Sequence, residues 1–403
     1  MVSTADGVII GGGVIGLSTA YNLARRSFGR IVLLEKETVG DGASSQAAGI
    51  ITGLLWTETG VEVRKISLAR FRELSDELDE YRYQDVGCLN LFSEEEWPDR
   101  KALLPLYDRL DFNYKILDSA EMRNRWPALS LPDGITGLFD PLGGYSEPDH
   151  YVPALARKCL ELGVDIREHQ QVGGFLDRSG RVAGVKTQAG DVEGDIVAST
   201  VHVWTLKVFE QIGWTLPLKS FTHQRYVTTP LETEVNIPAV NANPFGGYIR
   251  PHHGKRLLAG IESPDAFEFK VPGLSFRMEK VLPDPGLKHI AAKNLLSLVP
   301  GAGRPDWEFE RKGLLSFSMD GEPVLGPIRA LPGLFVGVAF HSGGFAYNPA
   351  AGVLLADYVA DGVPRINVNA FSPDRFNNAE KSDFMSSTIT QGEYSGLKGK
   401  RRH

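Results

Sequence analysis

Apolar and polar positions follow two different periods along this chain, and their order predicts the fold class. Apolar runs over residues 8–10 and 31–34, and an apolar-rich segment over 86–92, predict strands. Between the first two runs the pattern is helical, and over 60–82 apolar residues again recur near helical spacing with charged residues between them. Strands that alternate with helices in this way predict an α/β protein.

The first two predicted strands enclose a motif with specific chemistry. The first strand ends in Gly11-x-Gly13-x-x-Gly16, and the second ends at Glu35, about 20 residues beyond the last glycine. Such glycines let the backbone approach a pyrophosphate, the helix N-terminus faces its charge, and the acid accepts the ribose hydroxyls. We therefore predict an ADP-containing dinucleotide at this site. A glycine-rich turn that only packs a helix on a sheet is the alternative.

Composition excludes several classes of protein. A chain of 403 residues can bury a large core and form two domains, and its net charge of -7 gives no nucleic-acid footprint. No apolar run approaches the ~18 residues of a membrane span. Cys88 and Cys159 suit neither a disulfide framework nor a metal site, and the early first strand leaves no room for a signal peptide, so we expect a cytoplasmic protein without a metal. The polar tail from residue 377, with its basic end at 398–403, is expected to be flexible.

A small, polar segment beyond the acid carries a specific resemblance. Residues 42–50 read Gly-Ala-Ser-Ser-Gln-Ala-Ala-Gly-Ile. They resemble the loop that wraps the FAD diphosphate and ribityl chain in the D-amino-acid-oxidase superfamily, which includes glycine oxidase and sarcosine oxidase. Residues 318–327 resemble the family signature TxDGxPxIGP, and residues 341–352 resemble its closing glycine loop and helix start. The resemblance covers residues 7 to about 362 and favours FAD over NAD.

The resemblance implies a two-domain fold. A Rossmann-like FAD-binding domain is expected with an interleaved antiparallel-sheet α+β substrate domain. The FAD-binding domain would comprise residues 1–85, 140–215 and 313–376, and the substrate domain residues 86–139 and 216–312, with 377–403 as the tail.

The same resemblance implies the cofactor-binding residues. Val172 is expected to contact the adenine through its backbone, and the closing loop is expected to face the flavin, where reduction places negative charge. The family position of a covalent tether falls near Gly313, so FAD is expected to be non-covalent. The residues expected to bind it are Gly11, Gly13, Val14, Ile15, Gly16, Glu35, Lys36, Ser44, Ser45, Gln46, Ala48, Gly49, Ile50, Val172, Gly343, Gly344, Phe345 and Ala346.

The implied activity is that of an FAD-dependent oxidoreductase. Members of the family oxidise a C–N bond of an amine or amino acid by hydride transfer to flavin, and their protein groups mainly orient the substrate and exclude water. Two alternatives stay open: oxidation of an alcohol such as a 2-hydroxy acid or sugar, and a non-catalytic flavoprotein or subunit of a larger dehydrogenase. The expected partners are a small-molecule substrate and oxygen or another electron acceptor, and a homo-oligomer is possible.

Amino-acid members of the family usually bind the substrate carboxylate with a cation. At the two positions where relatives place that cation, this chain has the uncharged residues Leu315 and Ala346. Tyr248 matches a tyrosine that contacts substrate in glycine oxidase, and Arg250 lies two residues along the same strand, hence on the same face. Arg250 is therefore expected to supply the cation. The alternative is an exposed arginine, or one paired with an acid such as Glu262.

Two histidines complete the candidate catalytic set. His341 lies in the closing loop and is expected near the flavin. His202 stands where the family usually has glycine, so its side chain could touch FAD or substrate. A histidine at a helix start, hydrogen-bonded to backbone, is the alternative for His202.

Overall fold

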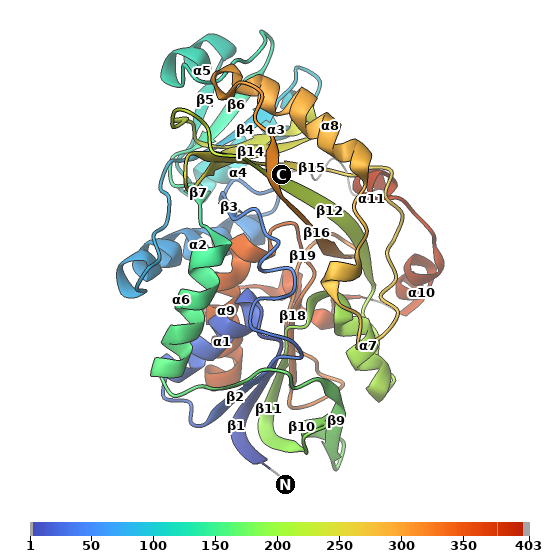
Figure 1. Ribbon diagram of the computed structural model, residues 1–403. Coiled ribbons are helices and arrows are strands. Elements are labelled where there is room, and N and C mark those ends of the chain that lie inside the picture. The colour runs from blue at the N-terminus through green and yellow to red at the C-terminus, as the bar shows by residue number, and fades with distance from the viewer. Residues whose placement is uncertain (1–2, 377, 398–403) are drawn as a thin grey trace.

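The computed structural model describes residues 3–376 and 378–397, and within them two large β-sheets lie one above the other (Figure 1). The lower sheet contains the N-terminal strand, and the upper sheet contains strands from the middle of the chain. The chain crosses between the sheets several times, as the predicted interleaving requires.

The lower sheet is the predicted nucleotide-binding sheet. Its central strand β1 (Ser3–Ile10) runs parallel to both β11 (Val192–Ser199) and β2 (Ile31–Leu34). Strand order is β17 (Val324–Pro327), β18 (Leu334–Val338), β11, β1, β2 and β8 (Asp165–Arg167), and a hairpin of β9 (Val172–Arg178) and β10 (Arg181–Thr187) pairs with β11. The parallel strands with a helix between them confirm the predicted Rossmann-like arrangement.

Both faces of the lower sheet are covered, which explains its continuous apolar runs. Ile9 and Leu33 pack into the core beneath the helices, whereas Val8 and Val32 pack on the opposite side. The helical side is built from α1 (Val14–Arg25), α2 (Glu58–Glu77), α6 (Pro148–Glu161) and α9 (Gly344–Asp361), and α7 (Thr205–Phe209) and the β9–β10 hairpin contribute to the other core.

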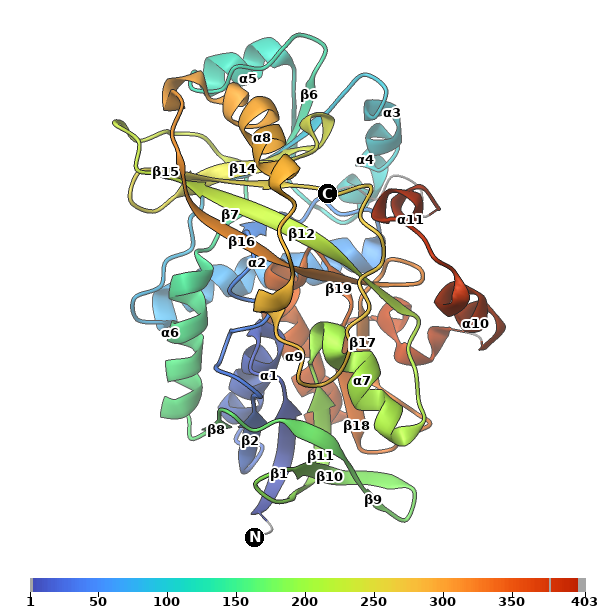
Figure 2. The ribbon, with the colours of Figure 1, turned by 45° about the vertical axis from the view of Figure 1, so that its right-hand side comes forward.

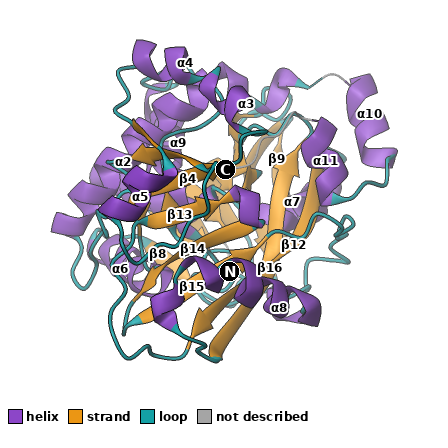
Figure 3. Ribbon diagram, turned by 90° about the horizontal axis from the view of Figure 1, so that it is seen from above, coloured by secondary structure: helices purple, strands orange, loops and turns teal. Residues whose placement is uncertain are grey.

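The upper sheet is mostly antiparallel. Its order is β19 (Phe340–His341), β16 (Trp307–Ser318), β12 (Leu218–Thr228), β15 (Arg256–Ile261), β14 (Gly247–His252), β13 (Ala239–Ala242), β4 (Cys88–Phe92), β6 (Thr136–Asp140) and β5 (Lys115–Leu117). Seen from above, α8 (Pro285–Asn294) and α5 (Ser119–Arg125) lie over this sheet (Figure 3). The predicted boundary at 313 falls inside β16, which stays paired with β12 up to Ser318.

Smaller elements join the two sheets. The two-stranded ribbon of β3 (Ile50–Ile51) and β7 (Gly144–Tyr145) lies between them, and α3 (Trp97–Lys101) and α4 (Leu104–Arg109) flank the upper sheet. No helix among residues 3–376 and 378–397 is long and apolar enough to cross a bilayer. Cys88 and Cys159 are separate, buried thiols.

The segment after residue 377 departs from the prediction of a flexible tail. Residues 378–397 form α10 (Asn378–Ser386) and α11 (Gln391–Leu397), which pack beside β12, β16 and β19 (Figure 2). Tyr394 is buried, its hydroxyl donates to the Ser318 carbonyl, and its ring packs on Phe221 and Phe317. Burial of this aromatic anchor orders a segment whose composition is polar. The basic residues 398–403 lie outside the described residues.

Candidate active site

A long cavity lies between the two sheets, at the carboxyl ends of the parallel strands. Its walls include residues that directly end or follow β1, β2, β11 and β18, which is where open α/β sheets bind ligands. Its roof is one face of the upper sheet. Residues at alternate positions of β12 and β16 line it: His223, Arg225, Arg311, Gly313 and Leu315.

The glycine turn at one end of the cavity is shaped by contacts that exclude side chains. Gly11 has φ +104°, and a Cβ on Gly16 would lie 2.0 Å from the Gly11 carbonyl oxygen. Glu35 is fixed beside this turn, since its carboxylate accepts the N–H groups of Gly12 (2.8 Å) and Glu37 (2.9 Å). Burial raises the pKa of Glu35. This geometry has the shape and the acceptor that a nucleoside with a pyrophosphate requires.

The N-terminus of α1 opens into the cavity next to the Ser44 hydroxyl. That oxygen accepts the Val14 N–H at 3.0 Å, and a Cβ on Gly13 would lie 3.0 Å from it. Lys36 lines the cavity too, but its ammonium donates to the Leu274 and Phe276 carbonyls. Helix N-terminus, serine hydroxyl and glycine turn therefore fit a dinucleotide diphosphate, while Lys36 holds a neighbouring segment in place.

Two buried arginines of the upper sheet hold the loop of residues 42–50. Arg225 donates from Nε to the Gln46 carbonyl (2.9 Å) and from a terminal nitrogen to the Ser45 carbonyl (3.1 Å). Arg250 donates from Nε to the Ala48 carbonyl at 2.6 Å. Because C=O and N–H of a trans peptide point in opposite directions, carbonyls drawn toward the sheet leave the following N–H groups directed away from it.

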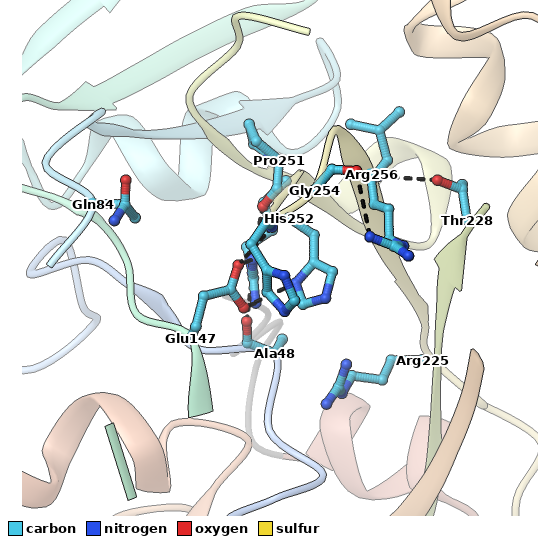
Figure 4. Close-up of polar contacts among 12 residues, drawn as sticks. Ala48, Gln84, Glu147, Arg225, Thr228, Pro251, His252, Gly254 and Arg256 are labelled. Carbon is cyan, nitrogen blue, oxygen red and sulfur yellow. Dashed lines mark hydrogen bonds and ion pairs between the residues drawn. The ribbon is translucent and has the colours of Figure 1, made fainter. Parts of the chain in front are cut away.

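The geometry runs against the prediction that Arg250 supplies a free cation. Its terminal nitrogens each lie 2.9 Å from one carboxylate oxygen of Glu147, and one of them also donates to the Pro251 carbonyl. His252 contacts the same carboxylate at 2.9 Å, and Figure 4 shows Glu147 facing His252 with Ala48 close by. These partners hold the pKa of Glu147 well below its usual range. Arg250 is thus paired with an acid, as the alternative allowed, although the acid is Glu147.

Arg225 is the cation that the sequence analysis did not single out. Its side chain lines the cavity, is buried, and forms no ion pair within the part of the chain that the structure describes. Burial lowers the pKa of Arg225 to about 10, so its charge persists at neutral pH. The available signal is its place among apolar and aromatic residues typical of a strand, but no pattern in the sequence indicates that it lacks an acid.

A neutral histidine–tyrosine pair lies beside Arg225. His223 Nε2 and the Tyr248 hydroxyl are 2.9 Å apart, and both residues line the cavity. Burial, aided by the charge of Arg225, lowers the pKa of His223 to about 4, and burial raises the pKa of Tyr248. The other ring nitrogen of His223 is buried without a hydrogen-bond partner among the described residues. It therefore offers one unused hydrogen-bonding position.

His223 was not predicted, whereas the two histidines that were, His202 and His341, also line the cavity. His202 begins a short 3-10 helix (His202–Trp204) with φ +47°, and its Nε2 lies 2.8 Å from the Leu314 carbonyl, as the helix-start alternative describes. Burial lowers the pKa of His202, so the ring is neutral. His341 has φ +45° and stacks on Phe317.

Most of the predicted cofactor residues line this one cavity. Gly16, Ser45 and Ala346 are not among the residues that line it. Those that line it are Gly11, Gly13, Val14, Ile15, Glu35, Lys36, Ser44, Gln46, Ala48, Gly49, Ile50, Val172, Gly343, Gly344 and Phe345. In addition, Arg64, Thr52 and Asn241 line it without having been predicted.

Comparison with known proteins gives one consistent family. The model of the DAO family, described as FAD dependent oxidoreductase, matches residues 6–358. Mitochondrial sarcosine dehydrogenase of Mus musculus is 27% identical over 94% of this chain, which corresponds to 42% of that enzyme. Glycine oxidase of Geobacillus kaustophilus is 28% identical over 89% of this chain and 94% of its own length.

Solved structures agree with the fold. L-proline dehydrogenase from P. horikoshii superposes with a TM-score of 0.85 over 93% of this chain and 98% of its own, at 23% identity. This chain spans less than half of the length of the first curated relatives it matches.

Proposed function

Because the chain belongs to the DAO family of FAD-dependent oxidoreductases, we propose that it oxidises the C–N bond of a small amino acid or amine by hydride transfer to FAD. The observation that carries the amino-acid form of this proposal is Arg225, a buried cation in the cavity wall with no ion pair in the described residues. A substrate carboxylate would supply the missing counter-charge, and an unpaired buried charge is costly.

FAD is proposed to bind without a covalent bond. The nucleoside end would lie at the Gly11 turn and Glu35, the diphosphate at the α1 N-terminus and Ser44, and the flavin toward α9 and the upper sheet. When bound, FAD supplies the two-electron acceptor for a hydride. Acid precipitation should release yellow FAD into the supernatant, and flavin that stays with the pellet would contradict the non-covalent proposal.

The chain's own groups orient the substrate and set its protonation state. Arg225 would bind the carboxylate, which fixes the direction of the C–H bond. The same positive charge, in a buried site, lowers the pKa of a nearby substrate ammonium and favours the neutral amine, whose lone pair assists hydride loss. The His223–Tyr248 pair, neutral on both sides, adds hydrogen bonds without adding charge.

The alcohol alternative receives no support from the comparisons. The matching relatives are named for sarcosine, dimethylglycine, glycine and 4-methylaminobutanoate, all of which are amines with a carboxylate. The electron acceptor, oxygen or another, and a homo-oligomeric state stay proposals for this chain.

The test distinguishes a contact of Arg225 with the substrate carboxylate from its contacts with the loop of residues 42–50. Anaerobic flavin bleaching is measured with sarcosine and with dimethylamine, which lacks the carboxylate, for wild type, Arg225→Met and Arg225→Lys. Loss of a charge-assisted contact should cost on the order of 2–4 kcal/mol with sarcosine, or roughly 30- to 1000-fold in bleaching efficiency, and much less with dimethylamine. Arg225→Lys should recover part of the loss.

Arg256→Gln serves as the control, since Arg256 pairs with Glu308 at the surface. Equal losses for both amines in Arg225→Met would show that Arg225 acts only through the loop. If no amine bleaches the flavin of the wild type, the proposed oxidation of a C–N bond is wrong.

A further inference from the structure

One row of paired residues crosses the upper sheet at the roof of the cavity. Each residue of the row is the cross-strand partner of the next, on the strands β4, β13, β14, β15, β12 and β16, so all of them point to the same face. The row consists of Asn90, Asn241, Tyr248, Gly260, Arg225 and Arg311. All but Asn90 and Gly260 line the cavity.

Gly260 determines the direction of the tyrosine in this row. A Cβ on Gly260 would lie 2.0 Å from the Tyr248 ring, so the ring lies across β15. Its hydroxyl reaches His223 on β12. Tyr248 therefore leans toward the arginine side of the roof and away from Asn241, on the other neighbouring strand.

The amide of Asn241 has a fixed orientation. Asn90 Nδ2 donates to the Leu138 carbonyl at 3.2 Å, and a backbone carbonyl can only accept. Asn90 Oδ1 is therefore the atom that faces Asn241, whose Nδ2 donates to it at 2.8 Å. The same Nδ2 lies 3.7 Å from Cys88 Sγ, also on β4. Both hydrogens of the Asn241 amide are thus directed to β4, and its oxygen is left over.

The oxygen of Asn241 is an unused acceptor in the cavity wall. No group donates to Oδ1 within residues 3–376 and 378–397, although the side chain is only 6% exposed and lines the cavity. A buried acceptor without a donor is costly. The roof therefore offers an N–H acceptor on β13 and the cation of Arg225 on β12. These two strands are about 14 Å apart, a distance that both side chains and one small amino acid together can bridge.

We propose that Asn241 Oδ1 accepts an N–H of the substrate amine while Arg225 binds its carboxylate, and that the site thereby selects primary and secondary amino acids over tertiary ones. The inference rests on the proposed function, because it concerns the amine of that substrate. Asn90 is a positioning residue, since it acts only through the Asn241 amide.

The hydrogen bond leaves the lone pair of the amine free. A neutral primary or secondary amine donates its N–H to Asn241 and keeps that pair. When the neighbouring C–H bond breaks and its electrons leave as hydride to the flavin, the lone pair forms C=N and the nitrogen becomes positive. The N–H is then a stronger donor, so the contact stabilises the transition state more than the bound substrate. A neutral tertiary amine has no N–H and gains nothing.

Two carboxylates of nearly the same shape test the hydrogen bond without turnover. Pyrrole-2-carboxylate has an N–H where an α-amino acid has its nitrogen, furan-2-carboxylate has an oxygen there, and neither has a C–H that can leave as hydride. In calorimetric titration, the flavin-loaded wild type should bind the pyrrole at least about tenfold more tightly. In Asn241→Leu, which is similar in size and apolar, the two Kd values should agree within about threefold.

The matched variants separate orientation of the amide from its presence. In Asn90→Ala the Asn241 amide can turn and donate to the furan oxygen, so the preference for the pyrrole should fall at least about threefold. Asn124→Leu, at an exposed asparagine of α5, is the control and should keep the wild-type preference. If Asn241→Leu does not retain flavin, the double variant Asn90→Leu/Asn241→Leu replaces it, because it leaves neither amide unpaired.

A wild-type preference below about tenfold, an unchanged preference in Asn241→Leu or Asn90→Ala, or no binding of either carboxylate would overturn the inference. Flavin bleaching tests the proposed function separately: a wild type that shows the expected binding but is bleached by no amine contradicts only that function. With amines that bleach, sarcosine should reduce the flavin at least about tenfold faster than N,N-dimethylglycine in the wild type. Equal rates, or the same ratio in Asn241→Leu, would also overturn the inference.

Discussion

A glycine without space for a side chain is the most sensitive single residue of the nucleotide end. In Gly16→Val the Cβ would lie 2.0 Å from the Gly11 carbonyl and 2.8 Å from the Thr200 hydroxyl, so α1 could not approach β1. We expect loss of bound flavin and a free energy of unfolding lower by about 1–3 kcal/mol. Flavin absorbance of the purified protein and urea unfolding measure both. Gly173→Ala is the control, since its nearest neighbouring atom lies 4.0 Å away, and similar flavin loss there would refute the explanation.

The residues that form the nucleotide end of the cavity could be predicted from sequence, but the arginine without an acid at its other end could not. The glycines and Glu35 act through local backbone geometry, and their spacing in the sequence indicates that geometry. Arg225 and Arg250 lie on the same sheet face, and sequence does not tell which of them meets an acid. Glu147, the partner of Arg250, is 103 residues away in the chain. Such a distant pairing depends on the packing of the two sheets.

At the scale of elements, the contact between β14 and the loop of residues 42–50 depends on one carboxylate. Glu147 pairs with Arg250, which in turn holds the Ala48 carbonyl. We expect Glu147→Gln to lower the free energy of unfolding by about 3–5 kcal/mol at pH 7, because it leaves a buried guanidinium unpaired. Glu308→Gln, at the exposed pair with Arg256, should cost under about 1 kcal/mol. Urea unfolding of both variants is the measurement.

The loss of unfolding free energy in Glu147→Gln should depend on pH, because the pKa of Glu147 is lowered in the folded protein. A carboxylate with a depressed folded-state pKa stabilises the fold fully above its unfolded pKa of about 4.3 and loses this stabilisation as pH falls toward the folded value. The difference in free energy of unfolding between wild type and Glu147→Gln should therefore be constant from pH 6 to 8 and become smaller below about pH 4. A gap that widens in acid would contradict this assignment.

Elements with strong local patterns were predictable, and those ordered by distant contacts were not. Strands β1 and β2 and helix α2 follow from their apolar spacing. In contrast, α10 and α11 have a polar composition, and they are ordered by contacts such as Tyr394 on Phe317 and the buried Lys219 donating to the Ser387 carbonyl. These contacts depend on the position of β12 and β16, about which the sequence of the tail contains no information.

At the scale of the whole molecule, the cavity is bounded by both sheets, so its ligand should couple their stabilities. The lower sheet contributes the Gly11 turn and Glu35, and the upper sheet contributes Arg225 and Tyr248. At a free FAD concentration of 100 times Kd, binding should raise the free energy of unfolding by about 2.7 kcal/mol. We therefore expect the apoprotein to unfold at a lower temperature than the flavin-loaded protein, and added FAD to raise its Tm in proportion to the logarithm of FAD concentration.

The number of thermal unfolding transitions shows whether FAD stabilises both sheets or only one. If the cofactor bridges the sheets, tryptophan fluorescence and far-UV circular dichroism should report one coincident transition in the loaded protein, shifted as a unit by FAD. Gly16→Val, unable to bind flavin, is the control and should show no shift. Two transitions, only one of which moves with FAD, would mean that the upper sheet gains nothing from the cofactor and that Arg225 and Tyr248 lie too far from it to act on a substrate at the flavin.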